Sequence, residues 1–417
     1  MYRIIAPDCS EKTVFLPTSK SITHRIFILA GLNQGQTTVS SWLDAEDTDI
    51  TLKALSQMGI RYKKNDDALI FTSPIGRIND EKIFLGNSGS SARFLIPLAA
   101  FMDKPVYYYG DTRLHQRPFA ELFVAIQKLN INFKCDNFTL PAYIYPGEMI
   151  GGEIYFDKLP SSQIITALML AGLWMKKDLL LHLPAHTPSL PYIQMTYQLM
   201  KRIGLTVNYR KNCIHIKAKR PNFNWYYAVE RDLSASSYWV VFALINQIKL
   251  ILPGITLPSL QGDERILEIA EQVGAKVILY SDRIEIEGSI EKSLSLNCLD
   301  IPDLVPALSI MALFSPRKFT LNNIRHLEYK ESNRVQALQE NIAALGGQSD
   351  YSNGNLTIYP QKKYAGAIIK SYNDHRIAMS FAIAGTKINN TTIDNPVCVN
   401  KSYPGFWKDF NFWREIQ

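Results

Sequence analysis

The sequence has few cysteines and no spacing of cysteine or histidine residues typical of a metal site. Its five cysteines are odd in number, lie far apart and include no close pair: Cys9, Cys135, Cys213, Cys298 and Cys398. This fits neither a disulfide framework nor a zinc site. The histidines His24, His326 and His375 also lack ligand-type spacing. We therefore expect no metal and five reduced cysteines.

Long apolar runs are also absent. The longest, Ile164 to Met175, is too short to cross a bilayer and stops at Lys176 and Lys177. The N-terminus lacks the charged-then-apolar layout of a signal peptide. We expect a cytoplasmic protein without a membrane contact.

A basic tract is missing as well, although the formal net charge is +7. Lysine and arginine residues are interspersed with acidic ones, which favours small anionic substrates over nucleic acid as partners. The 417 residues, of which 47% are apolar, can bury more than one core, so two domains are expected.

A unit of near-constant length recurs five times. In each copy an amphipathic helix ends near a glycine or asparagine, and two alternating strands with a polar turn follow. The residues at the helix ends are spaced by 71, 74, 70 and 72 positions: Gly59, Asn130, Gly204, Gly274 and Gly346. Glycine and asparagine suit the left-handed conformation that follows a helix C-terminus.

A second element repeats with the same period: a short polar sequence that opens a nearly all-apolar helix. It occurs six times, beginning at Ser21, Ser90, Ser162, Ser234, Asp303 and Asp374. A helix that is apolar on every side must be buried. Each half of the chain is therefore expected to wrap strands and amphipathic helices around three buried helices.

The sixth unit is expected to be closed by the N-terminus. The chain ends with FWKDFNFWREIQ, which leaves no room for a hairpin, while residues 2–16 are predicted to form two short strands about a turn. The expected domains are 19–229, and 1–18 together with 230–417, with the active site in the cleft between them and a hinge at the two crossings.

The starts of the buried helices carry an unusual number of cations. Helix starts present unpaired N–H groups and partial positive charge, which attract anions. Taken singly, the polar residues at each start can also be explained as an ordinary N-cap. However, Lys20, Arg25, Arg93 and Arg376 lie near these starts, where capping needs no cation and the helix dipole disfavours one. A bound anion would offset that cost.

Three further polar clusters lie outside the caps. Arg117 stands before a proline in DTRLHQRP, and Lys401 lies in VNKSYP. In YKESNR the spacing predicts that Lys330, Glu331 and Arg334 share one helical face, although a solvated charged face is the alternative.

These motifs, in this order, resemble the 3-phosphoshikimate 1-carboxyvinyltransferase family, also called EPSP synthase, over essentially the whole chain. The resemblance implies an α/β fold of two similar domains, each of three βαβαββ repeats (an inverse α/β barrel), six repeats in all, joined by two crossovers. It implies transfer of the enolpyruvyl group of phosphoenolpyruvate to the 5-hydroxyl of shikimate 3-phosphate, with release of phosphate, in aromatic amino-acid (chorismate) biosynthesis. No cofactor is implied, and we expect a monomer.

The resemblance also assigns site residues. Those for shikimate 3-phosphate, mainly on the 19–229 domain, are Lys20, Ser21, Arg25, Ser161, Ser162, Gln163, Ser189, Asp303 and Lys330. Those for phosphoenolpyruvate are Lys20, Asn87, Gly89, Arg117, Gln163, Arg334, Arg376 and Lys401. Arginine forks and lysine charges neutralise carboxylates and phosphates. The addition and elimination steps need proton transfer, for which the resemblance implies Asp303 as base and Glu331 as acid, assisted by Lys20.

The chain departs from the usual family pattern at six positions: Thr18, His24, Ser90, Phe94, Leu190 and Asn333. In the same order, the usual residues are Gly, Asn, Thr, Pro, either Lys or Arg, and Asp. None of these changes removes a proposed catalytic group. The resemblance further implies inhibition by glyphosate, which competes with phosphoenolpyruvate.

Two alternatives stay open. The related family that acts on UDP-N-acetylglucosamine shares the fold and phosphoenolpyruvate, but it usually carries a reactive cysteine on a loop, and DTRLHQRP has none. A repeat scaffold or nucleic-acid binder would have no reason to keep Asp303, Glu331 and the cations together, and would bind DNA or RNA in a salt-sensitive manner.

Overall fold

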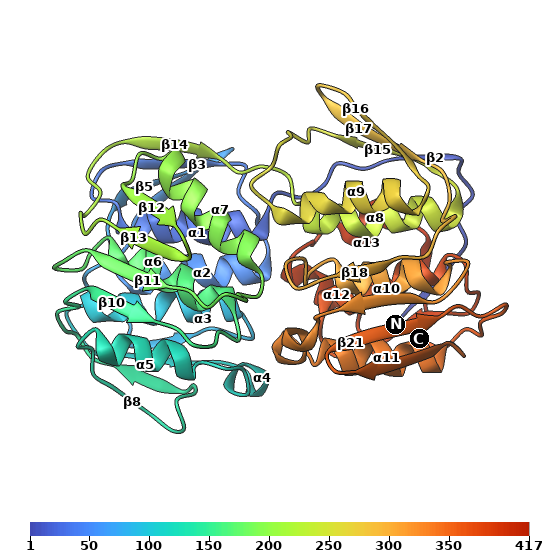
Figure 1. Ribbon diagram of the computed structural model, residues 1–417. Coiled ribbons are helices and arrows are strands. Elements are labelled where there is room, and N and C mark those ends of the chain that lie inside the picture. Colours follow the sequence, from blue (N-terminus) through green and yellow to red (C-terminus); the bar gives the residue numbers. More distant parts are fainter. Residues whose placement is uncertain (417) are drawn as a thin grey trace. The chain divides into compact units, whose positions relative to one another are not determined.

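The computed structural model describes residues 1–416, and the chain divides into two compact units (Figure 1). Unit 1 comprises Met1–Pro17 and Glu230–Gln417, and unit 2 comprises Thr18–Val229. The expected first boundary was one residue late. Thr18 belongs to unit 2 because it is buried and directly precedes Ser19, the N-cap of helix α1 (Lys20–Leu32).

Residues 1–416 form six four-stranded sheets, three in each unit, and all six have the same topology. In each, one edge strand runs parallel to its neighbour and the other pairings are antiparallel. This shared topology is the structural form of the repeat that the sequence period indicated.

The sheets of unit 2 are, in strand order, β14 (Trp225–Ala228), β3 (Thr37–Ser40), β5 (Ala68–Ser73) and β4 (Arg61–Asn65); β6 (Lys82–Phe84), β7 (Val106–Tyr109), β9 (Ala142–Ile144) and β8 (Phe133–Cys135); β10 (Gly152–Tyr155), β11 (Leu179–His182), β13 (Cys213–Ile216) and β12 (Val207–Arg210). Those of unit 1 are β2 (Glu11–Thr13), β15 (Lys249–Pro253), β17 (Arg283–Glu287) and β16 (Lys276–Leu279); β18 (Ser295–Asn297), β19 (Phe319–Asn322), β21 (Asn355–Tyr359) and β20 (Gln348–Ser352); β22 (Ile368–Ile369), β23 (Thr392–Ile393), β1 (Tyr2–Ile4) and β24 (Trp413–Glu415).

The nearly all-apolar segments form helices that are buried, as predicted. They are α1, α3 (Gly89–Leu95, continued by the 3-10 helix η1, Pro97–Phe101) and α6 (Ser162–Gly172) in unit 2, and α8 (Leu233–Asn246), α10 (Val305–Leu313) and α12 (His375–Gly385) in unit 1. Within unit 1 the three helices pack against one another, and within unit 2 α3 packs against α1 and α6. In Figure 1 the sheets of each unit lie around these helices.

The amphipathic helices lie between the buried helices and the hairpins in chain order. They are α2 (Glu46–Gln57), α5 (Ala120–Lys128), α7 (Leu190–Arg202), α9 (Arg265–Val273), α11 (Arg334–Ala344) and α13 (Phe406–Phe410). The residues expected after the first five have positive φ angles, from 71° at Asn130 to 119° at Gly274. The left-handed helix ends are thus confirmed. Short helices connect other elements: α4 (Thr112–His115), η2 (Gly262–Glu264), η3 (Arg325–Tyr329) and η4 (Pro396–Lys401).

The prediction for the N-terminal strands was partly wrong. Residues 2–16 do contain two strands, but β1 pairs with β23 and β24 in the sixth sheet, whereas β2 pairs with β15 in the fourth. The last residues also supply a strand, β24, which the sequence interpretation left out. The physical reason is pairing across the chain: Tyr2 stacks on Trp413 with ring centroids 3.8 Å apart, so the two ends of the chain complete one sheet.

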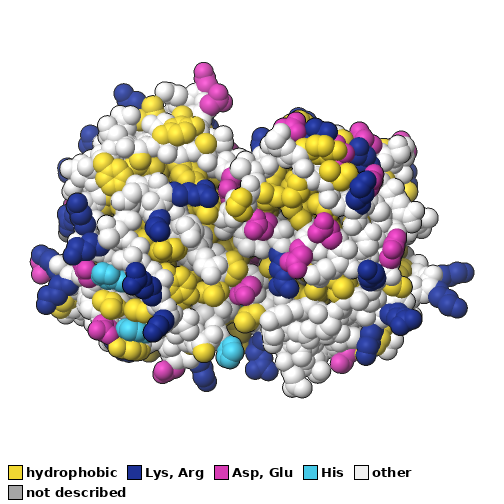
Figure 2. All heavy atoms as spheres, turned by 45° about the horizontal axis from the view of Figure 1, so that its top comes forward, with side chains coloured by type: hydrophobic (Ala, Val, Ile, Leu, Met, Phe, Trp, Pro, Cys, Tyr) yellow, Lys and Arg dark blue, Asp and Glu magenta, His cyan; other side chains and the backbone are white. Residues whose placement is uncertain are grey.

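The surface has no single basic patch on the face in view. Figure 2 shows lysine and arginine side chains scattered among acidic ones over both units. Among residues 1–416, no helix is both long and apolar enough to span a membrane.

Candidate active site

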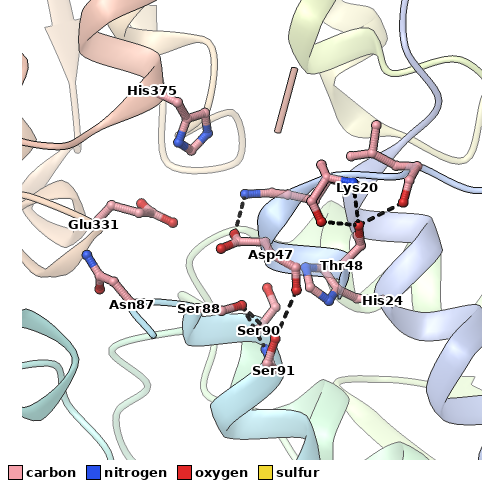
Figure 3. Close-up of polar contacts among 12 residues, drawn as sticks. Lys20, His24, Asp47, Thr48, Asn87, Ser88, Ser90, Ser91, Glu331 and His375 are labelled. Carbon is pink, nitrogen blue, oxygen red and sulfur yellow. Dashed lines mark hydrogen bonds and ion pairs between the residues drawn. The ribbon is translucent and has the colours of Figure 1, made fainter. Parts of the chain in front are cut away.

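Lys20 lies at the start of α1 and forms a buried ion pair. Its Nζ is 3.0 Å from Oδ2 of Asp47, a residue in the first turn of α2 (Figure 3). The sequence interpretation missed Asp47, because an acidic residue at a helix start is ordinary capping chemistry. The pair fixes the direction of the Lys20 side chain.

A chain of hydrogen bonds between polar side chains connects helices α1, α2 and α3 of unit 2. His24 Nδ1 and Thr51 Oγ1 are 2.7 Å apart, and the Thr51 and Ser91 hydroxyls are also 2.7 Å apart. The Ser91 and Ser88 hydroxyls are 2.6 Å apart (Figure 3). Burial lowers the pKa of His24 to about 3, so the imidazole is neutral at pH 7. The chain ties α1 and α3 to α2, which carries Asp47.

Arg93 and Gln163 hold each other in place. Arg93 Nη1 donates to Gln163 Oε1 over 2.8 Å, and the guanidinium lies 4.6 Å from the centroid of the Phe119 ring. Gln163 Nε2 in turn donates to Ser90 Oγ over 2.9 Å. The side chain of Gln163, a residue assigned to both substrates, is thereby oriented by α3.

Arg117 and Gly89 are in direct contact. A Cβ on Gly89 would lie 2.4 Å from the Arg117 guanidinium, so the side chain can lie across the start of α3 only because residue 89 is glycine. Arg117 Nη1 donates to the Asn87 carbonyl over 3.3 Å, while its buried Nε has no acceptor among residues 1–416. A buried guanidinium with so few acceptors is suited to an anion.

The serines assigned to shikimate 3-phosphate lie at helix starts of unit 2. Ser161 is the N-cap of α6 and its Oγ accepts from the Gln163 N–H over 3.3 Å. Ser162 is the first residue of that helix, and Ser189 precedes α7 in the left-handed conformation with φ 58°. Ser21 is the second residue of α1. The helix-start position predicted for Ser21, Ser161 and Ser162 is thus confirmed, whereas that of Ser189 was not predicted.

In unit 1, Asp303 is shared by two arginines. Its Oδ1 accepts from Arg334 Nη1 over 3.0 Å, and its Oδ2 accepts from Arg376 Nη2 over 2.7 Å. Burial alone would raise the pKa of Asp303, but the two guanidinium groups hold it well below its usual range. In this arrangement Asp303 is ionised.

Arg334 is the centre of a larger buried network. Besides Asp303, it contacts Glu331 (Nη2 to Oε2, 2.6 Å) and Asp374 (Nε to Oδ2, 2.9 Å). Burial alone would lower the pKa of the guanidinium, but Asp374, Glu331 and Asp303 together raise it. Ser332 also donates to Asp374 over 3.0 Å. Asp374 thus holds Arg334, a role beyond the helix start for which the sequence singled it out.

The shared helical face predicted for Lys330, Glu331 and Arg334 is wrong. Helix α11 begins only at Arg334, because the Asn333 side chain caps it by accepting from the Gln336 N–H. Lys330 and Glu331 lie in the segment between η3 and α11. Glu331 nevertheless contacts Arg334, although it lies outside the helix.

Further polar side chains of unit 1 are buried. Lys401 is the last residue of η4 and is buried. Arg376 also donates to Tyr238 Oη over 3.2 Å. Asp263, which the sequence interpretation did not single out, accepts from the Ser234 hydroxyl, and burial together with Asp303 raises its pKa to about 7. No group of three or more His, Cys, Asp or Glu side chains among residues 1–416 could hold a metal ion.

The fold and these residues define a class: a two-unit α/β protein with cations and hydroxyl groups at helix starts and buried carboxyl groups paired with arginines. Residues 6–410 match the family described as EPSP synthase (3-phosphoshikimate 1-carboxyvinyltransferase). The chain belongs to this family.

Individual relatives agree with this assignment. The chain is 33% identical over 403 residues to the 3-phosphoshikimate 1-carboxyvinyltransferase of Methanospirillum hungatei, covering 94% of each protein. It is 34% identical over 422 residues to that of Syntrophobacter fumaroxidans, covering 98% of this chain and 99% of the relative. The solved structure of EPSP synthase from Acinetobacter baumannii has the same fold, with a TM-score of 0.79 at 23% identity, over 98% of this chain and 97% of that one.

Proposed function

We infer that the chain catalyses transfer of the enolpyruvyl group of phosphoenolpyruvate to the 5-hydroxyl of shikimate 3-phosphate, the activity for which its family is named. The products are 5-enolpyruvylshikimate 3-phosphate and inorganic phosphate. In the addition step the hydroxyl oxygen attacks C2 of phosphoenolpyruvate while C3 gains a proton. In the elimination step the tetrahedral adduct expels phosphate and C3 loses a proton.

The observation that carries the proposal is the sharing of Asp303 by Arg334 and Arg376. Phosphoenolpyruvate bears a carboxylate and a phosphate, both of which suit arginine forks. When its anionic groups take N–H donors from these arginines, Asp303 loses part of the positive charge that holds its pKa down. Its pKa then moves upward, toward that of a working base, when the substrate is bound.

The remaining roles are those that the family resemblance implies for each side chain. In unit 1, Arg334, Arg376 and Lys401 would bind phosphoenolpyruvate, Asp303 would accept the proton of the 5-hydroxyl, Glu331 would exchange the proton at C3, and Lys330 would bind shikimate 3-phosphate. The residues of unit 2 divide in the same way. Lys20, Asn87, Gly89, Arg117 and Gln163 serve phosphoenolpyruvate, and Lys20, Ser21, Arg25, Ser161, Ser162, Gln163 and Ser189 serve shikimate 3-phosphate.

The test is phosphate release from phosphoenolpyruvate in the presence of shikimate 3-phosphate. We expect release by wild type and a loss of at least 100-fold in kcat for Asp303→Asn, the scale of a general base. Asp350→Asn removes the charge of an exposed aspartate on β20 and should leave the rate unchanged. Equal rates for Asp303→Asn and wild type would refute the assigned base.

A parallel reaction with UDP-N-acetylglucosamine tests the sister activity. Release of phosphate only with the UDP-sugar would move the chain to that family's reaction. The proposal further includes a cytoplasmic monomer that needs no metal or cofactor. Rates unaffected by a chelator, and a single mass near 47.4 kDa in light scattering, are the expected results.

A further inference from the structure

Arg25 is a buried cation whose hydrogen-bond acceptors are all neutral. Its side chain is only 2% exposed. Nε donates to Thr196 Oγ1 over 2.8 Å, Nη1 donates to the Ser21 carbonyl over 2.7 Å, and Nη2 donates to Thr166 Oγ1 and the Tyr192 carbonyl over 3.4 and 3.1 Å. A guanidinium has five N–H groups, so one N–H, on Nη1, has no acceptor in this set.

No carboxylate among residues 1–416 lies within ion-pair distance of this guanidinium, in contrast to Arg334, which contacts three. Burial lowers the pKa of Arg25 to about 10, which still leaves the group charged at pH 7. Hydroxyls and carbonyls satisfy N–H groups without cancelling the charge. The field of Arg25 is therefore available to a ligand.

Two contacts set the direction of the Arg25 side chain. The Thr196 hydroxyl donates to the Tyr192 carbonyl over 3.0 Å, so its lone pairs face Arg25 and Thr166. The Phe94 ring is fully buried and its centroid lies 5.3 Å from Arg25 Cζ, a cation–π distance. Phe94 stands where the family pattern usually has proline, and a proline at this position would lack the ring contact.

We propose that Thr196 and Phe94 are positioning residues. They hold the Arg25 guanidinium among uncharged groups, so that its positive charge can bind the anionic groups of shikimate 3-phosphate. The proposal rests on the proposed function, because it takes shikimate 3-phosphate as the ligand of Arg25. The new element is that Thr196 on α7 and Phe94 on α3 affect the affinity for shikimate 3-phosphate without contacting this substrate.

The experiment compares KM for both substrates, and kcat, in four variants by phosphate release. Thr196→Val keeps the shape but removes the acceptor, Thr196→Ser restores it, and Phe94→Leu removes the ring. Phe71→Leu is the control, because Phe71 is an equally buried ring that packs on Phe27 and Tyr62 instead. Thermal melts establish that each variant folds.

We expect Thr196→Val and Phe94→Leu to raise KM for shikimate 3-phosphate by about tenfold, the scale of one hydrogen bond to a charged group. KM for phosphoenolpyruvate should change less than about twofold, Thr196→Ser should approach wild type, and Phe71→Leu should lower the melting temperature alone. Unchanged KM for shikimate 3-phosphate in both variants, an equal rise for both substrates, or no rescue by serine would each overturn the proposal. A wild-type protein inactive with shikimate 3-phosphate would instead refute the proposed function itself.

Discussion

Replacing Asp374 by alanine should destabilise unit 1 far more than the loss of an ordinary helix cap, because this carboxylate has two tasks. It caps α12 by accepting from the Arg376 N–H over 3.0 Å, and it accepts from Arg334 Nε over 2.9 Å and from the Ser332 hydroxyl over 3.0 Å. The Asp374 and Arg334 side chains are 0% and 1% exposed, so water cannot replace the lost partner.

The magnitude follows from these contacts. Loss of a cap costs about 1 kcal/mol, and breaking a buried ion pair costs about 3 kcal/mol or more. Arg334 keeps Asp303 and Glu331, which favours the lower figure. The free energy of unfolding should therefore fall by roughly 4 kcal/mol, which corresponds to a decrease of about 8–16 °C in Tm for a unit of this size.

Thermal unfolding followed by tryptophan fluorescence and circular dichroism measures this change. The matched control is Asn333→Ala, because Asn333 caps α11 without an ion pair. The control should lower Tm by only about 2–4 °C. If Asp374→Ala were no less stable than Asn333→Ala, the network around Arg334 would not contribute to stability and the reasoning would fail.

Four further outcomes are expected. Burial raises the pKa of Asp263 to about 7, so its contribution to stability is present below about pH 4 and is lost as pH rises through 7. Asp263→Asn should remove this loss when the free energy of unfolding in urea is measured between pH 4.5 and 7.5. Equal slopes of the free energy of unfolding against pH for both proteins would contradict this. Because burial lowers the pKa of His24 to about 3, the wild type loses stability as pH falls from 6.5 toward 3, and His24→Asn should lose less over the same acid titration. Gly89→Ala should displace the Arg117 guanidinium and raise KM for phosphoenolpyruvate with little change for shikimate 3-phosphate, and an unchanged KM would show that Arg117 does not bind that substrate. Glyphosate should inhibit competitively with phosphoenolpyruvate, and rates unaffected by millimolar glyphosate at low phosphoenolpyruvate would contradict this.

The repeat and the burial of its helices could be predicted because both depend on local patterns. Apolar residues on every face of α1, α8 and α10 leave burial as the one stable arrangement in water. The glycine and asparagine residues after the amphipathic helices have the left-handed angles that their small or polar side chains tolerate. Most of the assigned residues likewise lie at helix starts, since the motifs that named them are cap sequences.

The partners of those residues could not be predicted in the same way. Asp47 is 27 positions from Lys20, and Asp374 is 40 positions from Arg334. Nothing in the local pattern distinguishes these aspartates from ordinary helix caps. The same limit explains why β1 and β2 were assigned to one hairpin although they join two different sheets.

By itself, then, the sequence determined the period, the six buried helices and the residue types at their starts, because hydrophobic pattern and capping act within a few residues. The tertiary structure alone decided which charges neutralise one another. In unit 1 Arg334 and Asp303 belong to one network of ion pairs, whereas in unit 2 Arg25 keeps its charge among neutral hydrogen-bond acceptors. The reason is physical: an ion pair depends on the distance between groups in space, and the chain brings those groups together only when it folds.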